Sequence, residues 1–477
     1  MAIVFVLVAL LVLAVLVTAN WYVWRRLFRD TTRGPGPVRR AGAVLVAGGW
    51  ALTVAALVAE RGGAPFRLQQ VLAWPGFLWM ALSLYLLLAV LAGEAVRPLL
   101  RRFLERRARG RAVEAGEREP ERTADHATVA AGAPGRPGTT GASEAAGIPG
   151  ASGTSAEEAR RPVAARAARD TSAPATGTPA PGTTVPDGPS GPDGPSAPVD
   201  PAGPSRRLFV SRVVAGAAAA AAVGTVGYGT HGVLSGPKVK RVTVPLAKLP
   251  RGAHGFRIAV VSDIHLGPVL GRGFAQRVVD TINATQPDLI AVVGDLVDGS
   301  VKDLGPAAAP LARLTARHGA YFVTGNHEYF SGAEQWVEEV RRLGLRPLEN
   351  ARTELPYFDL AGVNDVAGEE EGQGPDYVRA LGDRDPARAC VLLAHQPVQI
   401  HEAVEHGVDL QLSGHTHGGQ LFPGNLIASA ANPTLAGLER YGDTQLYVSR
   451  GAGAWGPPTR VGAPSDITVV ELASRQA

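Results

Sequence analysis

The chain has 477 residues, which is too many for one compact domain and enough for two or three. Its mean hydropathy of +0.05 is high for a soluble protein, so membrane segments are expected. Residues 1–230 carry a net charge of +9 and residues 231–477 a net −5, so the second half offers no basic surface for nucleic acid. The single cysteine, Cys390, excludes an intramolecular disulfide and leaves the redox compartment open.

Residues 1–100 are predicted to form a membrane region with three transmembrane helices. The apolar runs cover residues 3–19, 41–59 and 71–92, and each is long enough to span a bilayer. Arginine-rich stretches follow the first and third runs, at residues 25–40 and 97–111, whereas the loop after the second holds only Arg61 and Arg67. The positive-inside rule therefore places the N-terminus outside and the chain after the third helix in the cytoplasm. A cleaved signal peptide is the alternative for the first run, but no positive charge precedes it.

Residues 101–204 are predicted to be a disordered cytoplasmic linker. The segment begins with arginines and continues with Ala, Gly, Pro, Ser and Thr, among few large apolar side chains. Such a composition cannot bury enough apolar area to offset the loss of chain entropy on folding.

Residues 205–230 resemble an export signal that stands inside the chain. Arg206 and Arg207 are followed by Phe209 and by an Ala/Gly-rich apolar run. Because the linker is predicted to be cytoplasmic, a fourth helix here would carry the rest of the chain across the membrane. We predict a twin-arginine-like signal that stays as a fourth transmembrane helix, since no small-x-small cleavage site precedes His231. An ordinary fourth span and an Ala-rich core helix are the alternatives.

Residues 231–477 are predicted to form an α/β or α+β domain with a large sheet. Short β-rich runs alternate with stretches of helical periodicity. The expected strands cover residues 256–263, 288–295, 320–326, 389–395, 408–415 and 445–451, and the expected helices cover residues 273–284, 307–317 and 333–343.

Polar side chains follow five of these expected strands at the point where each strand ends. In chain order they are Asp263 and His265, Asp295 and Asp298, Asn326 and His327, His395, and His415 and His417. Strand ends at one edge of a sheet are where ligands bind in open α/β folds. Carboxylate and amide oxygens with imidazoles, and no thiolate, suit divalent metals, and one carboxylate can bridge two ions. Each motif alone is weak, but the five in this order are a specific signal.

This order of motifs, D-x-H, G-D-x-x-D, G-N-H-[DE], H and G-H-x-H, resembles the calcineurin-like metallophosphoesterases over about residues 239–472. Residues 414–424 and 447–467 are most similar to the membrane-anchored or exported bacterial branch. The resemblance implies a four-layer α/β/β/α sandwich of two mixed sheets. It also implies two divalent metal ions, Mn, Fe or Zn. The implied ligands are Asp263, His265 and His417 for one ion and Asn326, His395 and His415 for the other, with Asp295 as the bridge.

The resemblance further implies hydrolysis by a hydroxide that bridges the metals, with His327 as the general acid and Asp298 orienting its ring. The bond would belong to a phosphomonoester, a phosphodiester or a pyrophosphate. The expected partners are a phosphorylated small-molecule or lipid-linked substrate and the membrane, with no nucleic acid; a UDP-diacylglucosamine-type or other lipid or nucleotide-sugar pyrophosphate is the alternative. A catalytically dead scaffold should have lost ligands, and none is missing here. The sequence contains no G-x-S-x-G elbow or P-loop in this region, so a serine hydrolase or an NTPase has no support.

We therefore expect a multi-pass protein of the cytoplasmic membrane whose catalytic domain is extracytoplasmic, with the twin-arginine translocase as a partner during export. That route moves folded proteins, which would allow metal to be loaded first. Four other residues have open roles. Glu328 could support the metals or only form a turn, Arg450 and Arg460 are expected on the surface rather than on a phosphate, and Trp455 is expected to pack rather than to wall a cleft.

Overall fold

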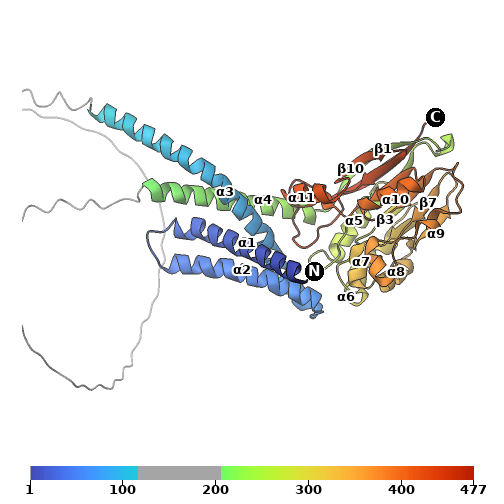
Figure 1. The fold of residues 1–477 in the computed structure, drawn as a ribbon, viewed down its shortest axis with the longest axis horizontal. Coiled ribbons are helices and arrows are strands. Elements are labelled where there is room, and N and C mark those ends of the chain that lie inside the picture. Colours follow the sequence, from blue (N-terminus) through green and yellow to red (C-terminus); the bar gives the residue numbers. More distant parts are fainter. Residues whose placement is uncertain (1, 117–205, 477) are drawn as a thin grey trace, which may run out of the picture. The chain divides into compact units, whose positions relative to one another are not determined.

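The structure is a computed structural model that describes residues 2–116 and 206–476. Residues 1–107 and 204–477 cluster into one compact unit, and the description below concerns this unit. It contains long helices and a domain built on two six-stranded sheets (Figure 1).

Four helices are long and apolar enough to cross a membrane. They are α1 (Ala2–Trp24), α2 (Pro37–Arg61), α3 (Phe66–Gly116) and α4 (Arg206–Leu234), with a π-helical turn, η1 (Arg25–Arg29), after α1. The helix α3 extends beyond the expected span, so the first residues of the expected linker are helical up to Gly116; the remainder, residues 117–205, lies outside the described residues. Arg206 and Arg207 form the first turn of α4.

Apolar side chains point outwards along these helices. On α1, Leu7, Leu11 and Val17 are exposed by 60%, 65% and 60%. A soluble protein rarely leaves so continuous an apolar surface in water, whereas a bilayer removes that cost. The exposed faces therefore support membrane association.

The first sheet has the strand order β1-β12-β2-β3-β4-β5. Its strands are β1 (Lys238–Leu246), β2 (Phe256–Val261), β3 (Leu289–Val293), β4 (Ala320–Val323), β5 (Arg346–Pro347) and β12 (Asp466–Ser474). The strands β2 to β5 are parallel, and β12 pairs antiparallel with β2 and parallel with β1. The sheet is therefore mixed.

The second sheet has the order β10-β11-β9-β8-β7-β6 and is also mixed. Its strands are β6 (Ala351–Glu354), β7 (Asp359–Gly362), β8 (Cys390–Leu393), β9 (Leu410–Ser413), β10 (Gly437–Tyr441) and β11 (Thr444–Val448).

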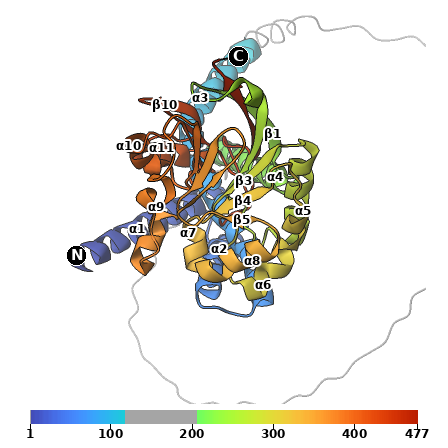
Figure 2. The same ribbon diagram turned by 90° about the vertical axis from the view of Figure 1, so that its right-hand side faces the viewer.

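The two sheets pack face to face, and helices cover their outer faces (Figure 2). Along β2 the side chains alternate, so that Ile258 and Val260 join the core between the sheets while Ala259 and Val261 join the core beneath the helices. The helices α5 (Arg272–Ala284), α6 (Val301–Ala308) and α8 (Ala333–Arg342) cover the first sheet, and α9 (Tyr377–Leu381) and α10 (Ile400–Glu405) cover the second. This arrangement confirms the expected four-layer sandwich of two mixed sheets.

The remaining short elements connect these layers. They are α7 (Asn326–Ser331), α11 (Gly424–Ala431) and the 3₁₀ turns η2 (Arg251–Ala253), η3 (Ala309–Arg313), η4 (Val366–Glu371), η5 (Pro397–Gln399) and η6 (His417–Gly419). The helix expected over residues 307–317 is wrong, because α6 ends at Ala308 and only the turn η3 follows. Pro310 lies in that turn, and its lack of an amide hydrogen disfavours continuation of the α-helix.

Candidate metal centre

The nine predicted site residues lie in the loops that follow five strands of the two sheets. Asp263 and His265 follow β2, Asp295 and Asp298 follow β3, Asn326 and His327 follow β4, His395 follows β8, and His415 and His417 follow β9. Since the two sheets present these strand ends to the same region, residues up to 154 positions apart in the chain meet there.

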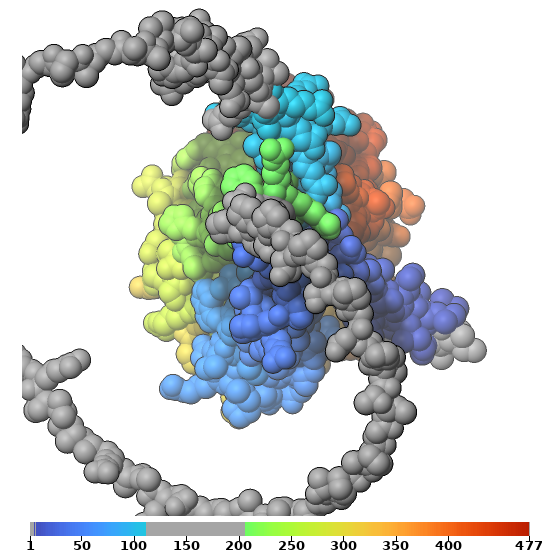
Figure 3. Space-filling view, turned by 90° about the vertical axis from the view of Figure 1, so that its left-hand side faces the viewer, coloured from blue at the N-terminus to red at the C-terminus, as the bar shows by residue number. Residues whose placement is uncertain are grey.

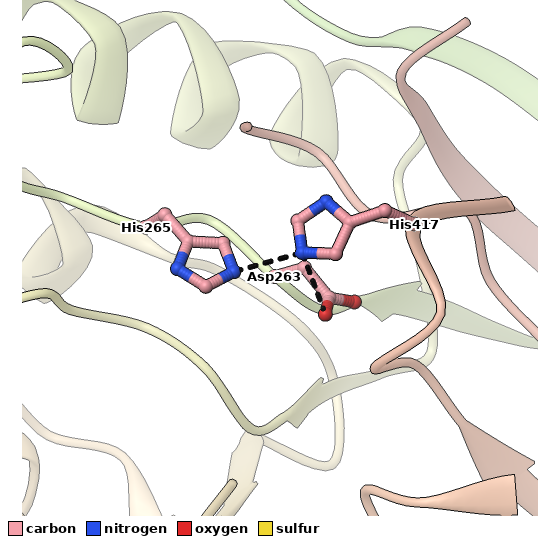
Figure 4. Close-up of side chains that lie close together, drawn as sticks. All are labelled: Asp263, His265 and His417. Atoms are coloured by element: carbon pink, nitrogen blue, oxygen red, sulfur yellow. Dashed lines mark hydrogen bonds and ion pairs between the residues drawn. The ribbon is translucent and has the colours of Figure 1, made fainter. Parts of the chain in front are cut away.

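One group consists of Asp263, His265 and His417, all of which are buried (Figure 4). The Nε2 atoms of His265 and His417 are 2.9 Å apart, and Nε2 of His417 is 3.4 Å from Oδ1 of Asp263. Two imidazole nitrogens can be this close only if at least one carries no proton, so a lone pair faces the space between the residues. This donor set fits a divalent cation.

A second group consists of Asp295, His395 and His415. Nε2 of His395 lies 3.2 Å from Oδ2 of Asp295 but, although buried, makes no well-aligned hydrogen bond to any described residue. Nδ1 of His415 is 3.0 Å from Oδ1 of Asn326, which brings Asn326 into the same group. A buried nitrogen without a hydrogen-bond partner is what a metal ion would satisfy, so this group also fits a cation.

Asp295 faces both groups. Its Oδ2 is 3.7 Å from Nε2 of His265 as well as 3.2 Å from Nε2 of His395. Burial opposes ionisation of Asp295, but the neighbouring histidines, His395 first, hold its pKa well below the usual range. The same carboxylate, through burial countered and outweighed, raises the pKa of His395 well above its usual value.

Asp298 links His327 to the first group. Its Oδ1 lies 2.7 Å from Nδ1 of His327 and 2.8 Å from Nδ1 of His265, so a single carboxylate orients both rings. Burial would lower the pKa of His327, but Asp298 outweighs it and raises that pKa to about 9. The ring of His327 is flanked by those of Phe330 and Trp455, each with its centroid 5.6 Å away.

The backbone at this site is held in unusual conformations. Asp263, His265, Asp295, His415 and His417 all have positive φ, between 47° and 71°. Non-glycine residues adopt this region at a cost of roughly 1–3 kcal/mol each and keep it only where the surroundings enforce it. Gly325 illustrates the crowding, because a Cβ at that position would collide with the carboxylate of Asp295.

Glu328 supports the loop that carries Asp295, a role that the sequence left open beside a plain turn. Its buried carboxylate accepts hydrogen bonds from the backbone amides of Asp295, Leu296 and Gly325, at 2.9, 2.8 and 2.7 Å. Burial and the charge of Asp295 raise the pKa of Glu328 to about 7 although these amides favour its ionised form. The capping of α7 by Glu328 thus fixes the loops after β3 and β4 against each other.

Arg460 has a role that the sequence did not reveal. The expectation of a surface arginine is wrong, because Arg460 is only 5% exposed. Its guanidinium donates hydrogen bonds to the carbonyls of His417 and Gly453, at 3.0 and 2.6 Å, and lies 2.9 Å from Nδ1 of His417. Arg460 therefore holds His417 from behind. The expected packing role of Trp455 is also wrong, since this side chain is 54% exposed beside His327.

Replacement of Arg460 by lysine should lower metal affinity and hydrolytic activity by about 10–100-fold, because lysine keeps the charge but loses the fork that grips His417. Metal content and the rate of ester hydrolysis would be measured on the full chain in detergent. The exposed Arg475→Lys serves as the matched control. Unchanged metal content in Arg460→Lys would show that His417 does not need this support.

Comparisons with known proteins agree with this geometry. The family model described as Calcineurin-like phosphoesterase matches residues 256–419. A transmembrane protein with metallophosphoesterase domain from Danio rerio is 39% identical over 259 residues, which cover 51% of this chain and 59% of that protein. An uncharacterized metallophosphoesterase from Helicobacter pylori strain J99 is 38% identical over 253 residues, which cover 52% of this chain and 68% of that protein.

Among solved structures, the sulfate thiohydrolase SoxB of Thermus thermophilus is 17% identical and covers 43% of each chain, with a TM-score of 0.27. The family model and the sequence relatives carry the assignment: this chain belongs to the calcineurin-like phosphoesterase family.

Proposed function

We propose that this chain is a membrane-anchored hydrolase that uses two divalent metal ions to cleave a phosphomonoester, phosphodiester or pyrophosphate bond. The observation that carries the proposal is the position of Asp295 between two groups of ligands, 3.2 Å from His395 and 3.7 Å from His265. Divalent ions such as Mn, Fe or Zn, when bound there, would lower the pKa of a water molecule and polarise the phosphoryl oxygens.

His327 serves as the general acid in this proposal. Asp298 accepts the Nδ1 proton of His327, so Nε2 is the atom that can deliver a proton to the leaving oxygen. Nε2 makes no hydrogen bond to any residue in the described ranges, and the ring is 78% buried against its neighbours without being closed off from the cleft. The contact with Asp298 keeps the ring at a fixed angle during this transfer.

The proposed reaction is tested on the full chain in detergent, stripped with a chelator and reloaded separately with Mn²⁺, Fe²⁺ and Zn²⁺. Hydrolysis of nitrophenyl phosphate, bis-nitrophenyl phosphate and a diphosphate diester would be followed together with the number of bound ions per chain. Turnover with two bound ions supports the proposal. A single ion per active chain contradicts the dinuclear site, and bound metal without turnover of any substrate favours a dead scaffold.

A lipid-linked pyrophosphate, as in a UDP-diacylglucosamine-type reaction, is the second candidate, and the apolar surroundings of the site favour it. Phe330 and Trp455 are exposed by 74% and 54% on either side of His327. The loop beside the site contacts α3, where the hydroxyl of Tyr85 donates to the carbonyl of Phe422 at 3.0 Å. Leu421 packs into the same apolar cluster as Tyr85. A substrate with an apolar part would find contacts here that a small hydrophilic ester would not.

Trp455→Ala should therefore lower kcat/KM for an amphiphilic phosphodiester by about fivefold, the effect of losing part of one aromatic contact. The rate for a small water-soluble ester should stay within about twofold, which provides the internal control. Equal loss for both substrates would mean that Trp455 shapes the metal site rather than the substrate contact.

The proposed location is the cytoplasmic membrane, with several passes and the catalytic domain outside the cytoplasm. A phosphatase reporter fused after Tyr228 should be active and one fused within residues 117–205 inactive; the reverse result would place the domain in the cytoplasm. Repeating the first fusion in a host without the twin-arginine translocase tests the proposed export partner. Full activity in that host would assign Arg206 and Arg207 another role.

A further inference from the structure

We propose that a pocket at the arginine-rich ends of the four long helices binds the phosphate group of an anionic membrane lipid. This arginine pocket has a volume of about 390 Å³ and is lined by seven arginines but by only one acidic residue, Asp30, among the described residues. It lies apart from the metal centre, at the end of the helix bundle that Figure 3 faces. The inference goes beyond the proposed hydrolysis and does not depend on it.

The pocket is assembled from segments far apart in the sequence. Its arginines include Arg26 and Arg29 of η1, Arg39 of α2, Arg97 and Arg101 of α3, and Arg207 of α4. Hydrogen bonds between segments shape its walls. Arg39 donates to Oγ1 of Thr32 at 2.7 Å and to the carbonyl of Arg29 at 3.1 Å, and Arg212 of α4 donates to the carbonyl of Thr31 at 3.0 Å. The arginines are therefore held together by the fold and are not independent surface side chains.

The pocket contains more positive charge than its acidic neighbours neutralise. Asp30 and Glu94 are both paired with Arg26, at 2.9 Å each, and Glu94 is shared with Arg97 at 3.2 Å. Within residues 2–116 and 206–476, no acidic side chain forms an ion pair with Arg29, Arg101 or Arg207. Like charges gathered at this distance repel one another, so a bound anion would stabilise the arrangement.

Arg97 supplies the strongest local evidence for a ligand. Its side chain is 7% exposed, it lines the pocket, and its Nε has no hydrogen-bond partner among the described residues. A buried cationic donor left without an acceptor costs free energy. An anion in the pocket would provide the missing acceptor.

The chemistry of the pocket favours phosphate, and its position favours a lipid. Guanidinium groups match the oxygens of a phosphate in paired hydrogen bonds. The flanking surface is apolar, because Phe103 of α3 and Phe209 of α4 are 57% and 49% exposed, two residues from Arg101 and Arg207 in the sequence. Basic pockets between membrane helices, with apolar surface beside them for acyl chains, suit anionic headgroups. Such a lipid would join all four helices and would give Arg207 a function in the folded protein.

The experiment titrates the full chain, delipidated in a nonionic detergent, with phosphatidylglycerol, with phosphatidylcholine, or with inorganic phosphate or pyrophosphate. The melting temperature is followed as each probe is added, and the concentration for half of the shift is recorded. The pocket variant is Arg97→Gln with Arg207→Gln. The matched control is Arg106→Gln with Arg107→Gln, which removes the same charge from exposed positions of α3 outside the pocket.

We expect phosphatidylglycerol, but not phosphatidylcholine, to raise the melting temperature. The pocket variant should need about 30-fold more phosphatidylglycerol, at about fivefold per arginine, and the control less than about twofold more. If Arg97→Gln weakens the fold, Arg207→Gln alone, at the exposed first turn of α4, should still show the fivefold change. Equal losses in the two double variants, or equal effects of the two lipids, would overturn the proposal. Saturation by free phosphate or pyrophosphate at the same concentration as the lipid would overturn the lipid as the source of the phosphate.

Discussion

Replacement of Asp295 by asparagine should abolish hydrolysis, with a loss of at least about a thousandfold in kcat. Asp295 is the only carboxylate that faces both ligand groups among the described residues, and its neighbouring histidines keep it ionised despite burial. Asparagine preserves the volume but removes the charge on which the binding of two cations would depend. The bound metal should therefore fall by at least one ion per chain, which elemental analysis of the purified protein would measure.

The control for this substitution is Asp280→Asn, on the exposed face of α5, where the carboxylate only accepts a bond from Gln276. It should retain full activity and metal content. Melting curves of both variants would separate a local loss of metal from a loss of fold. Retained activity in a folded Asp295→Asn protein would contradict the bridging role of this residue.

Replacement of His327 by asparagine should lower kcat by about 10²–10⁴ for substrates with a poor leaving group. The reason is that the leaving alkoxide then has no proton donor, whereas the metal ligands themselves are unchanged. Nitrophenolate needs little protonation, so nitrophenyl esters should lose much less activity than alkyl esters in the same variant.

This dependence on the leaving group distinguishes a proton donor from a structural residue. Asp298→Asn should show the same trend to a smaller degree, because it removes the acceptor 2.7 Å from Nδ1 of His327, and it should also disturb His265. An equal loss for alkyl and nitrophenyl esters in His327→Asn would mean that His327 supports the metal site and does not donate the proton.

The sandwich and the positions of the site residues follow from local sequence signals. Buried parallel strands such as β3 are short apolar runs that end abruptly in polar residues, so both the strand and the residues after it can be recognised. The four layers and the division of the ligands into two groups came from the resemblance to a family, because no local pattern states which strands pair.

Other features could not be predicted because long-range packing determines them. Arg460 stands in a segment rich in Gly and Pro that reads as a surface loop, and only the folded chain shows that this loop closes behind His417. Glu328 has three amide partners that come from two different loops. The helix expected at residues 307–317 failed because its periodicity outweighed the effect of Pro310 in the prediction.

The position of β12 has a consequence for biosynthesis. This strand, the last one made of those described, lies between β1 and β2 and pairs with both. While the ribosome still holds Asp466–Ser474, the first sheet has a gap at its second position, and β1 has no partner among the described strands. The helices α1 to α4 are synthesised long before that gap can close. The domain therefore completes its sheet only after translation of β12, on a chain whose membrane helices have already been made.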